Sequence, residues 1–366
     1  MPQLFYVPIE PLVERYTESW YRNFPTTFRS AGFDVTVIDG VPLEDEVKVG
    51  TFLDVNSTVH YKSTQLAQIA ALFNQRRVPN GSVFFFGDVE FWGIESVRLL
   101  AQMNRLDVTI TGFLHAGSYT IEDAFAVAAP YQQYTEVGWL AACDRVYVGS
   151  DYHYHAFRER RLIPLGADDN LRSRLMVTGN PLFKSDYPLV DVSKRNKVVL
   201  PNRFDIEKRP DRSLEVARLI KNASPETEIV ITTSRSTFRS NSENLVSLAQ
   251  QAEADGIVII KSGLTKSEYH KELAESKVMI SCSIEENFGY CIAESLVYGC
   301  TPVLTDLASH PEFPSAVLFT TNDQAAAAAL RVLSTPYSEP HIPSTFWDAG
   351  NLIAADIYYL LDGIEV

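Results

Sequence analysis

Strand-like runs alternate with helical runs along the whole chain, and this alternation limits the possible folds more than any other feature. The first series of strand-like runs lies at 4–9, 34–38, 83–89, 107–114, 145–149 and 175–178. The second series lies at 198–201, 228–233, 256–261, 278–281, 301–305 and 317–319. Helical patterns fill the gaps, notably at 12–30, 58–77, 94–105 and 124–143. Alternation of this kind is typical of parallel α/β layers, so the sequence predicts two doubly wound sheets.

The domain boundaries are predicted from chain length and from one break in the alternation. A chain of 366 residues with 46% hydrophobic content is long enough to bury two cores. Residues 181–196 contain prolines and polar residues without a clear period, which indicates a linker. We therefore expect one Rossmann-like domain at 1–180, a second at 197–343, and a final helix within 344–366, which carries more apolar side chains than one exposed face needs.

Composition excludes several classes of protein. The formal net charge of −14 repels phosphate backbones, which disfavours non-specific nucleic-acid binding. The sequence has no apolar run long enough to cross a membrane and no basic-then-apolar leader, so we expect a protein of the cytoplasm, or of the host cytoplasm if its source is a virus, without membrane insertion. The cysteines do not form close pairs, which argues against a disulfide framework. They are Cys143, Cys282, Cys291 and Cys300.

Glu286 and Glu294 lie eight positions apart on either side of a predicted strand-to-helix junction. The apolar run at 278–281 predicts a strand, 285–288 the loop beyond its carboxyl end, and 289–298 a helix. A helix amino terminus presents backbone N–H groups and a positive dipole end, which suits a phosphate group. Because each carboxylate can also hold a pair of hydroxyls, the junction suits a nucleotide sugar.

The residues around this junction resemble the Glu-x7-Glu motif of retaining glycosyltransferases of the family 4 type. The matching stretches are Glu286-Asn287-Phe288-Gly289, Glu294-Ser295 and Gly299-Cys300-Thr301-Pro302-Val303, with Asn287 where the family has a small residue. The resemblance implies the GT-B fold, with two Rossmann-like domains facing across a cleft and a carboxyl-terminal helix that crosses back to the first domain. It also implies that Phe288, Gly289, Tyr290 and Glu294 bind the donor. An ordinary buried α/β unit with two solvated glutamates is the alternative.

Arg203 and Lys208 follow the first strand of the second series. A diphosphate leaving group needs cations as charge grows on it. The spacing resembles the family's Gly-Arg…Glu-Lys-Gly segment, which implies that this pair holds the donor diphosphate, although Asn202 replaces the usual glycine. A surface loop with scattered charge is the alternative. Similarly, the resemblance places Gly263 and Leu264 beside the nucleobase, whereas a plain helix-capping arrangement also explains them.

His115 ends a strand of the first series, where it resembles the family's histidine that contacts the donor sugar. A packing role is the alternative. Asp88, at another strand end, is a candidate for acceptor binding or for a loop and helix-cap role. Glu10, Glu14 and Arg15 are candidate acceptor residues in the loop after the first strand. The family carries a glycine pair in that loop, so this departure leaves the acceptor class open.

Two further clusters contain residue types that are common in binding sites. Arg158, Arg160, Arg161, Arg172 and Arg174 concentrate in 158–174, which we interpret first as a solvated helix and loop, with a polyanion contact as the alternative. His153 and His155 look like a metal-ligand pair, but positions i and i+2 of a helix face different ways, so no metal site is predicted.

The sequence thus predicts a retaining glycosyltransferase that uses a nucleoside-diphosphate sugar and needs neither a cofactor nor a metal. His115, Arg203, Lys208 and Glu286 are its predicted catalytic residues. An epimerase, a phosphorylase or a non-catalytic sugar-nucleotide-binding protein on the same scaffold remains open. The acceptor also stays open between a glycan, a small metabolite and a hydroxymethylated DNA base, the last as in viral enzymes that modify their own genomes.

Overall fold

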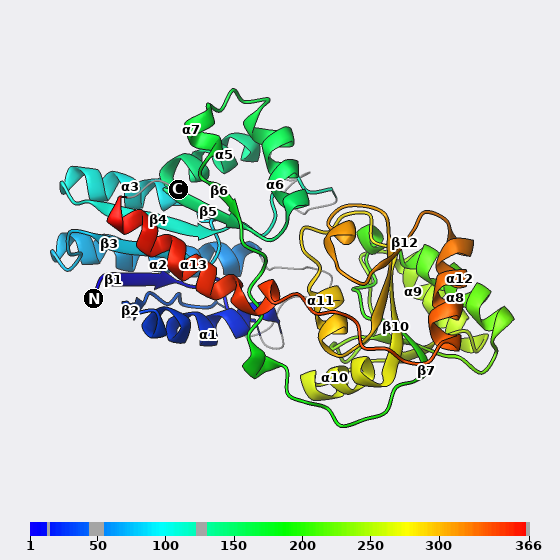
Figure 1. Ribbon diagram of the computed structural model, residues 1–366. Helices are drawn as coiled ribbons and strands as arrows, with labels where there is room; N and C mark the ends of the chain where they lie inside the picture. Colours follow the sequence, from blue (N-terminus) through cyan, green and yellow to red (C-terminus); the bar gives the residue numbers. More distant parts are fainter. Residues whose placement is uncertain (13–14, 44–54, 122–129, 364–366) are drawn as a thin grey trace. The chain divides into compact units, whose positions relative to one another are not determined.

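A computed structural model describes residues 1–12, 15–43, 55–121 and 130–363 (Figure 1). The chain divides into two compact units, each considered by itself below. Unit 1 comprises Met1–Phe183 and Thr345–Val366, and unit 2 comprises Lys184–Ser344. The predicted boundaries near residues 180 and 344 lie within a few residues of these divisions.

The sheet of unit 1 has six parallel strands in the order β2-β1-β3-β4-β5-β6. They are β1 (Gln3–Val7), β2 (Asp34–Val37), β3 (Ser82–Phe86), β4 (Val108–Phe113), β5 (Arg145–Val148) and β6 (Leu175–Val177). All residues of β3 are buried, as expected for a parallel strand covered on both faces. The strand order reverses between β1 and β3, so ligands are expected beyond the carboxyl ends of these two strands.

Helices cover both faces of this sheet. They include α1 (Tyr16–Ser30), α2 (Val55–Asn74), α3 (Ile94–Met103), α5 (Gln132–Ala142), α6 (Asp151–Phe157), α7 (Asp169–Arg172) and α13 (Thr345–Asp362). The final helix, α13, is fixed to unit 1 by Asp356, whose Oδ2 accepts hydrogen bonds from Arg145 Nε at 3.1 Å and from the Tyr147 hydroxyl at 2.9 Å. Tyr358 packs against Phe33 with ring centroids 4.4 Å apart.

The sheet of unit 2 also has six parallel strands, in the order β12-β11-β10-β7-β8-β9. They are β7 (Arg195–Leu200), β8 (Glu228–Thr232), β9 (Ile259–Lys261), β10 (Ser276–Ser281), β11 (Thr301–Thr305) and β12 (Val317–Phe319). The covering helices are α8 (Pro210–Ala223), α9 (Glu243–Ala254), α10 (Lys266–Glu275), α11 (Tyr290–Val297) and α12 (Asn322–Ser334). The order reverses between β7 and β10, which marks the expected ligand site.

The predicted α/β fold with two Rossmann-like halves is confirmed, and every strand-like run corresponds to a strand. Element ends were less accurate. β7 begins at Arg195, inside the predicted linker, and α1 begins at Tyr16 rather than at residue 12. The amino-terminal part of the helix predicted at 124–143 falls partly at 122–129, outside the described residues. Among the described residues, no helix is long and apolar enough to span a membrane.

Candidate functional site

Two loops of unit 2 meet at the point where the strand order reverses. The loop after β7 and the loop after β10 are tied together by side-chain and backbone hydrogen bonds. Asn202 Nδ2 donates to Ser281 Oγ at 2.6 Å, and the Ile284 backbone N–H donates to Glu207 O at 3.0 Å. These bonds fix the two loops as one structural unit at the carboxyl edge of the sheet.

Lys208 and Glu286, which were predicted separately from distant segments, form an ion pair across the two loops. The Lys208 ammonium donates to Glu286 Oε2 at 2.6 Å and approaches Glu285 O at 3.4 Å. Both side chains are mostly buried, at 13% and 18% exposure. A predicted phosphate-binding cation and a predicted sugar-binding carboxylate are therefore in direct contact.

Arg203 is held by two carboxylates of its own loop, which sequence reasoning did not identify. Its guanidinium donates to Asp205 Oδ2 and to Glu207 Oε1, both at 2.9 Å, while 43% of the side chain stays exposed. Asn241 fixes the same loop, because its side chain accepts from the Ile206 N–H and its own N–H donates to Asp205 Oδ1. A diphosphate at Arg203 would compete with these carboxylates.

The ion pairs leave little space between them. The hollow lined by Asn202, Arg203 and Lys208 has a volume of about 10 Å³, which is the room of one water molecule. A bound phosphate would therefore have to displace the side-chain partners of these cations rather than enter a ready-made cavity.

Gly289 is the N-cap residue of α11, and only glycine suits this position. Its φ of +89° lies in the left-handed region, and an added Cβ would come within 2.8 Å of Ile292 Cδ1 and 3.1 Å of Glu286 Cγ. The preceding Phe288 is 8% exposed, and its carbonyl accepts a hydrogen bond from Ser309 Oγ at 3.3 Å. This packing fixes the helix amino terminus beside the Lys208–Glu286 pair, where its N–H groups favour an anion.

Glu294 lies one turn further along α11, and both of its carboxylate oxygens have partners. Oε1 accepts from Lys266 Nζ at 2.5 Å, and Oε2 accepts from the Tyr269 hydroxyl at 3.1 Å. Cys291 lies near both glutamates of the motif. Burial, and then the negative charges of Glu294 and Glu286, raise the pKa of the Cys291 thiol to about 12.

Lys266 and Tyr269 were missed by sequence reasoning, although a signal was present. Thr265 and Glu268 form a capping box that begins α10 at Lys266. Residues three apart on a helix share a face. The capping signature could therefore have shown that the ammonium and the phenol lie together.

Gly263 and Leu264, the predicted nucleobase neighbours, precede this helix and are pinned to the loop after β8. The Gly263 N–H donates to Arg235 O at 2.7 Å, and the Leu264 N–H donates to Thr233 O at 3.2 Å. Gly263 adopts a left-handed φ of +69°. The segment thus has a fixed backbone close to the helix that carries Lys266.

In unit 1, His115 lies beyond the carboxyl end of β4, as predicted, and both of its ring nitrogens face protein atoms. Nε2 lies 2.8 Å from Gly87 O and Nδ1 lies 3.4 Å from the Tyr16 hydroxyl. Because a carbonyl only accepts, Nε2 is assigned the proton. Burial lowers the pKa of His115, so the ring is neutral.

Asp88 lies beyond the carboxyl end of β3 and pairs with Lys62 of α2, which sequence reasoning missed. The Lys62 ammonium donates to Asp88 Oδ2 at 2.7 Å, and the Glu90 N–H donates to Oδ1 at 3.0 Å. The two side chains are 5% and 10% exposed. Burial opposes ionisation, but the Lys62 charge prevails and holds the pKa of Asp88 below its ordinary value.

The remaining acceptor candidates lie near the amino ends of two helices. Glu10 is 7% exposed, and its two oxygens accept from Ser57 Oγ and Thr58 Oγ1 of α2, each at 3.1 Å. Arg15 occupies the N-cap position of α1, and Glu14 lies outside the described residues. Glu10 thus has an internal structural role, and acceptor binding by these residues stays a prediction.

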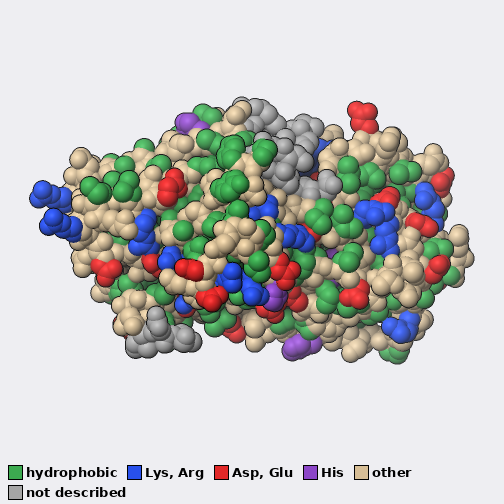
Figure 2. Space-filling view, turned by 90° about the horizontal axis from the view of Figure 1, so that it is seen from above, with side chains coloured by type: hydrophobic (Ala, Val, Ile, Leu, Met, Phe, Trp, Pro, Cys, Tyr) green, Lys and Arg blue, Asp and Glu red, His purple; other side chains and the backbone are tan. Residues whose placement is uncertain are grey.

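Three arginines of the 158–174 segment bond to the protein itself rather than forming a solvated face. The bonds run from Arg160 Nη1 to Tyr119 O (2.9 Å), from Arg161 Nε to Glu136 Oε2 (2.7 Å) and from Arg174 Nη1 to Cys143 O (2.7 Å). On the face shown in Figure 2, basic and acidic side chains are interspersed. For these three arginines the structure corrects the interpretation of a solvated helix and loop, although 168–170 of the same segment are exposed, and it gives the polyanion contact no support.

The two histidines of α6 do not act together. His153 is 1% exposed and its ring contacts the Tyr119 hydroxyl, whereas His155 is exposed. No cluster of three or more metal-ligating side chains occurs among the residues that the structure describes.

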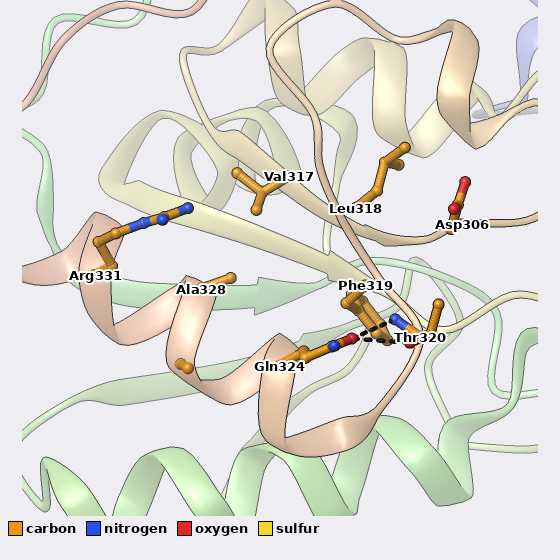
Figure 3. Close-up of a pocket in the computed structure, with 9 residues that line it drawn as sticks. Asp306, Val317, Leu318, Phe319, Thr320, Gln324, Ala328 and Arg331 are labelled. Carbon is orange, nitrogen blue, oxygen red and sulfur yellow. Dashed lines mark hydrogen bonds between the residues drawn. The ribbon is translucent and has the colours of Figure 1, made fainter.

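A broad surface hollow of about 480 Å³ lies elsewhere in unit 2, between β12 and α12 (Figure 3). Val317 and Leu318 line it from the strand, and Gln324 and Arg331 line it from the helix. The Gln324 side-chain carbonyl is occupied in capping its own helix, since it accepts from Thr320 N at 2.9 Å. None of the predicted donor-binding residues lines this hollow, so size alone does not mark the site.

A comparison with known protein families finds a match within unit 2. Residues 188–334 match the family described as Glycosyl transferases group 1. This match covers most of unit 2 and includes the donor-binding residues predicted in that unit, so residues 188–334 are similar to a group 1 glycosyltransferase domain. No curated protein sequence matches the chain significantly.

Solved structures resemble the chain in fold at low sequence identity. Sucrose-phosphate synthase from Thermosynechococcus elongatus is 13% identical with a TM-score of 0.68, covering 100% of this chain and 99% of that one. The lipopolysaccharide outer core galactosyltransferase WaaB is 14% identical with a TM-score of 0.63 and full coverage of both chains. A mutant of S. aureus TarM, in a complex that contains UDP, is 14% identical with a TM-score of 0.53, covering 81% of this chain and 56% of TarM. The shared fold is that of GT-B glycosyltransferases.

Proposed function

We propose that this protein is a retaining glycosyltransferase that moves a sugar from a nucleoside-diphosphate sugar to an acceptor hydroxyl. One observation carries the proposal. Lys208, Glu286 and the start of α11 converge where the strand order of unit 2 reverses, within the matched segment 188–334. A cation, a carboxylate and a helix amino terminus are the groups that a diphosphate joined to a sugar requires.

The donor diphosphate binds at Arg203, Lys208 and the first N–H groups of α11. It replaces Glu286 on the Lys208 ammonium, and the released carboxylate then accepts hydrogen bonds from hydroxyls of the transferred sugar. Glu294 accepts from the ribose hydroxyls, and Gly263 and Leu264 border the base. The ion pairs therefore neutralise the site before the donor arrives.

The reaction is a front-side displacement. The bond between the anomeric carbon and the diphosphate oxygen breaks, and the acceptor oxygen bonds to the same face of that carbon. The leaving diphosphate takes the proton of the acceptor hydroxyl. Arg203 and Lys208 stabilise the negative charge that grows on the diphosphate, so no divalent metal is required.

The acceptor is proposed to be a hydroxyl of a carbohydrate or of another small polar molecule. Structural neighbours named as sucrose-phosphate synthase and as a lipopolysaccharide galactosyltransferase support this class. The alternative of a hydroxymethylated DNA base has less support, because three arginines proposed to contact it bond internally. Contact between His115 and the donor sugar stays a prediction.

An activity screen tests the proposal. The protein is incubated with UDP-, GDP-, ADP- and CDP-sugars, together with simple sugars, sugar phosphates or a duplex containing hydroxymethylcytosine, at two salt concentrations. We expect one donor to release its diphosphate with transfer to a sugar acceptor, and NMR to show retention at the anomeric carbon. Release of free sugar phosphate instead, inversion, or no turnover of any donor would contradict the proposal.

A further inference from the structure

Lys266, Tyr269 and Glu294 form a closed cluster between α10 and α11. Besides its bond to Glu294, the Lys266 ammonium lies 5.3 Å from the centroid of the Tyr269 ring. Each member of the cluster therefore contacts the other two, at 2.5 Å for the ion pair and 3.1 Å for the phenol–carboxylate hydrogen bond. With both oxygens held, the Glu294 carboxylate cannot rotate without breaking a contact.

The helices that carry the cluster are themselves fixed at their starts. The Thr265–Glu268 capping box sets the first turn of α10, which contains Lys266 and Tyr269. The left-handed Gly289 sets the first turn of α11. The cluster thus holds Glu294 in a defined place rather than joining two mobile surface side chains.

The cluster leaves acceptor capacity on Glu294. An ionised carboxylate offers about four lone-pair positions on its two oxygens. One position on each oxygen is taken, by the ammonium and by the phenol, so each oxygen can accept one further hydrogen bond. The Glu294 side chain is 9% exposed. Two hydroxyls on neighbouring carbons, as in a ribose, match two carboxylate oxygens held in one plane.

We propose that Lys266 and Tyr269 are positioning residues that hold the Glu294 carboxylate for both ribose hydroxyls of the donor, and so select ribonucleotide over deoxyribonucleotide donors. The inference rests on the proposed function, because it takes a nucleotide to bind beside Glu294. A carboxylate held by a single partner could turn toward whichever hydroxyl is present, whereas one held by two partners is sensitive to the loss of either hydroxyl.

Calorimetry with nucleoside diphosphates tests the inference. The diphosphate that binds the unaltered protein most tightly among UDP, GDP, ADP and CDP is compared with its 2′-deoxy and 3′-deoxy counterparts. We expect the ribose form to bind roughly tenfold more tightly than either, the usual scale for one hydrogen bond to a charged group. Glu294→Gln should bring these affinity ratios close to one.

Lys266→Met and Tyr269→Phe should each reduce the affinity ratios at least threefold by weakening the ribose form alone. Lys271→Met, on the same helix and outside the cluster, should leave the ratios unchanged. Thermal unfolding reports whether each variant is folded. If Lys266→Met does not fold, Tyr269→Phe and Lys266→Arg still test the positioning role. In Lys266→Arg the charge is kept, so the ratios should largely return.

The outcomes separate this inference from the proposed function. If Glu294→Gln abolishes the discrimination but Lys266→Met and Tyr269→Phe keep it, the positioning role is wrong and the glycosyltransferase proposal is unaffected. If Glu294→Gln also keeps the discrimination between ribose and deoxyribose forms, Glu294 does not bind the ribose and the inference is wrong. If no nucleoside diphosphate binds the unaltered protein, the proposed function itself fails.

Discussion

The two sheets of this protein have the same number of parallel strands but use their carboxyl edges differently. In unit 1, Lys62 and Asp88 pair where side chains are at most 10% exposed. In unit 2, the Arg203 side chain is 43% exposed, and the Lys208–Glu286 pair, at 13% and 18% exposure, lies beside the start of a helix. The Lys62–Asp88 pair of unit 1 is thus shielded from solvent, whereas the carboxylate partners of Arg203 in unit 2 can be displaced by an incoming anion.

This difference shows that strand order alone does not decide which switch point binds a ligand. Removing one partner of a buried ion pair leaves the other charge buried without a partner, which costs about 3–5 kcal/mol. The pairs that Arg203 makes with Asp205 and Glu207 are partly exposed and contribute about 0–1 kcal/mol, so an incoming phosphate displaces them at little cost. The more buried Lys208–Glu286 pair opens only when the phosphate takes the place of Glu286 on the ammonium. On the proposed function, the Lys62–Asp88 pair serves mainly stability, and the pairs at Arg203 and Lys208 give way to the donor.

Lys62→Met gives the largest expected loss of stability. Asp88 would lose its buried cationic partner, so the free energy of unfolding should fall by about 3–5 kcal/mol. Urea unfolding measures this. Adding Asp88→Leu to Lys62→Met should recover part of the loss, because no charge is then buried alone. A loss below about 1 kcal/mol in the single variant would show that this pair does not stabilise unit 1.

Lys208→Ala is expected to act on turnover rather than on stability. It removes a cation that stabilises the leaving diphosphate, so kcat/KM should fall roughly 100- to 1000-fold. Lys221→Ala is the matched control, since that half-buried lysine of α8 in unit 2 donates to Pro225 O and is not among the predicted donor-binding residues. Equal kcat/KM in both variants would remove Lys208 from the donor site.

Glu286→Gln separates rate from binding. The kcat should fall roughly tenfold, because the neutral amide interacts more weakly with the hydroxyls of the reacting sugar. Nucleoside diphosphate should bind as tightly as before or a few-fold more tightly, since Lys208 no longer has a competing carboxylate. Steady-state kinetics and calorimetry give the two numbers. Weaker diphosphate binding would contradict the proposed exchange at Lys208.

His153 gives unit 1 a smaller, pH-dependent loss of stability. Burial lowers the pKa of His153 to about 3, whereas an unfolded histidine titrates near 6.5. As the pH falls below about 6.5, His153 is protonated in the unfolded chain but not in the folded protein. The free energy of unfolding therefore falls until about pH 3. Between pH 6.5 and 5.0 this amounts to about 1.6 kcal/mol. In His153→Gln that part of the pH dependence should disappear from urea unfolding curves.

Excess chelator should have the smallest effect of all. In the proposed mechanism, Arg203, Lys208 and the start of α11 provide the positive charge that a metal would otherwise supply, so turnover should stay unchanged. The assay compares initial rates with and without EDTA. Loss of activity that magnesium or manganese restores would overturn the proposed mechanism.

The sequence predicted the layers well because buried parallel strands are short continuous apolar runs. Strand order was not predictable from the sequence, since it depends on pairing between distant segments. Ion-pair partners that are distant in sequence cannot be predicted for the same reason. Glu286 and Lys208 were identified as single residues, but Lys62 lies on a helix far from Asp88 in sequence, with no local period to link them. Counting charges in 158–174 also failed, because it cannot show that Arg160 and Arg174 bond to backbone carbonyls.

Binding of nucleoside diphosphates to the unaltered protein, to Lys208→Ala and to Lys62→Met tests the central claim most directly. Calorimetry at a temperature where all three proteins are folded is the measurement. The account predicts that one diphosphate binds at a single site, that Lys208→Ala weakens it at least tenfold, and that Lys62→Met leaves it unchanged. Equal affinity in the unaltered protein and in Lys208→Ala, or a loss confined to Lys62→Met, would contradict it.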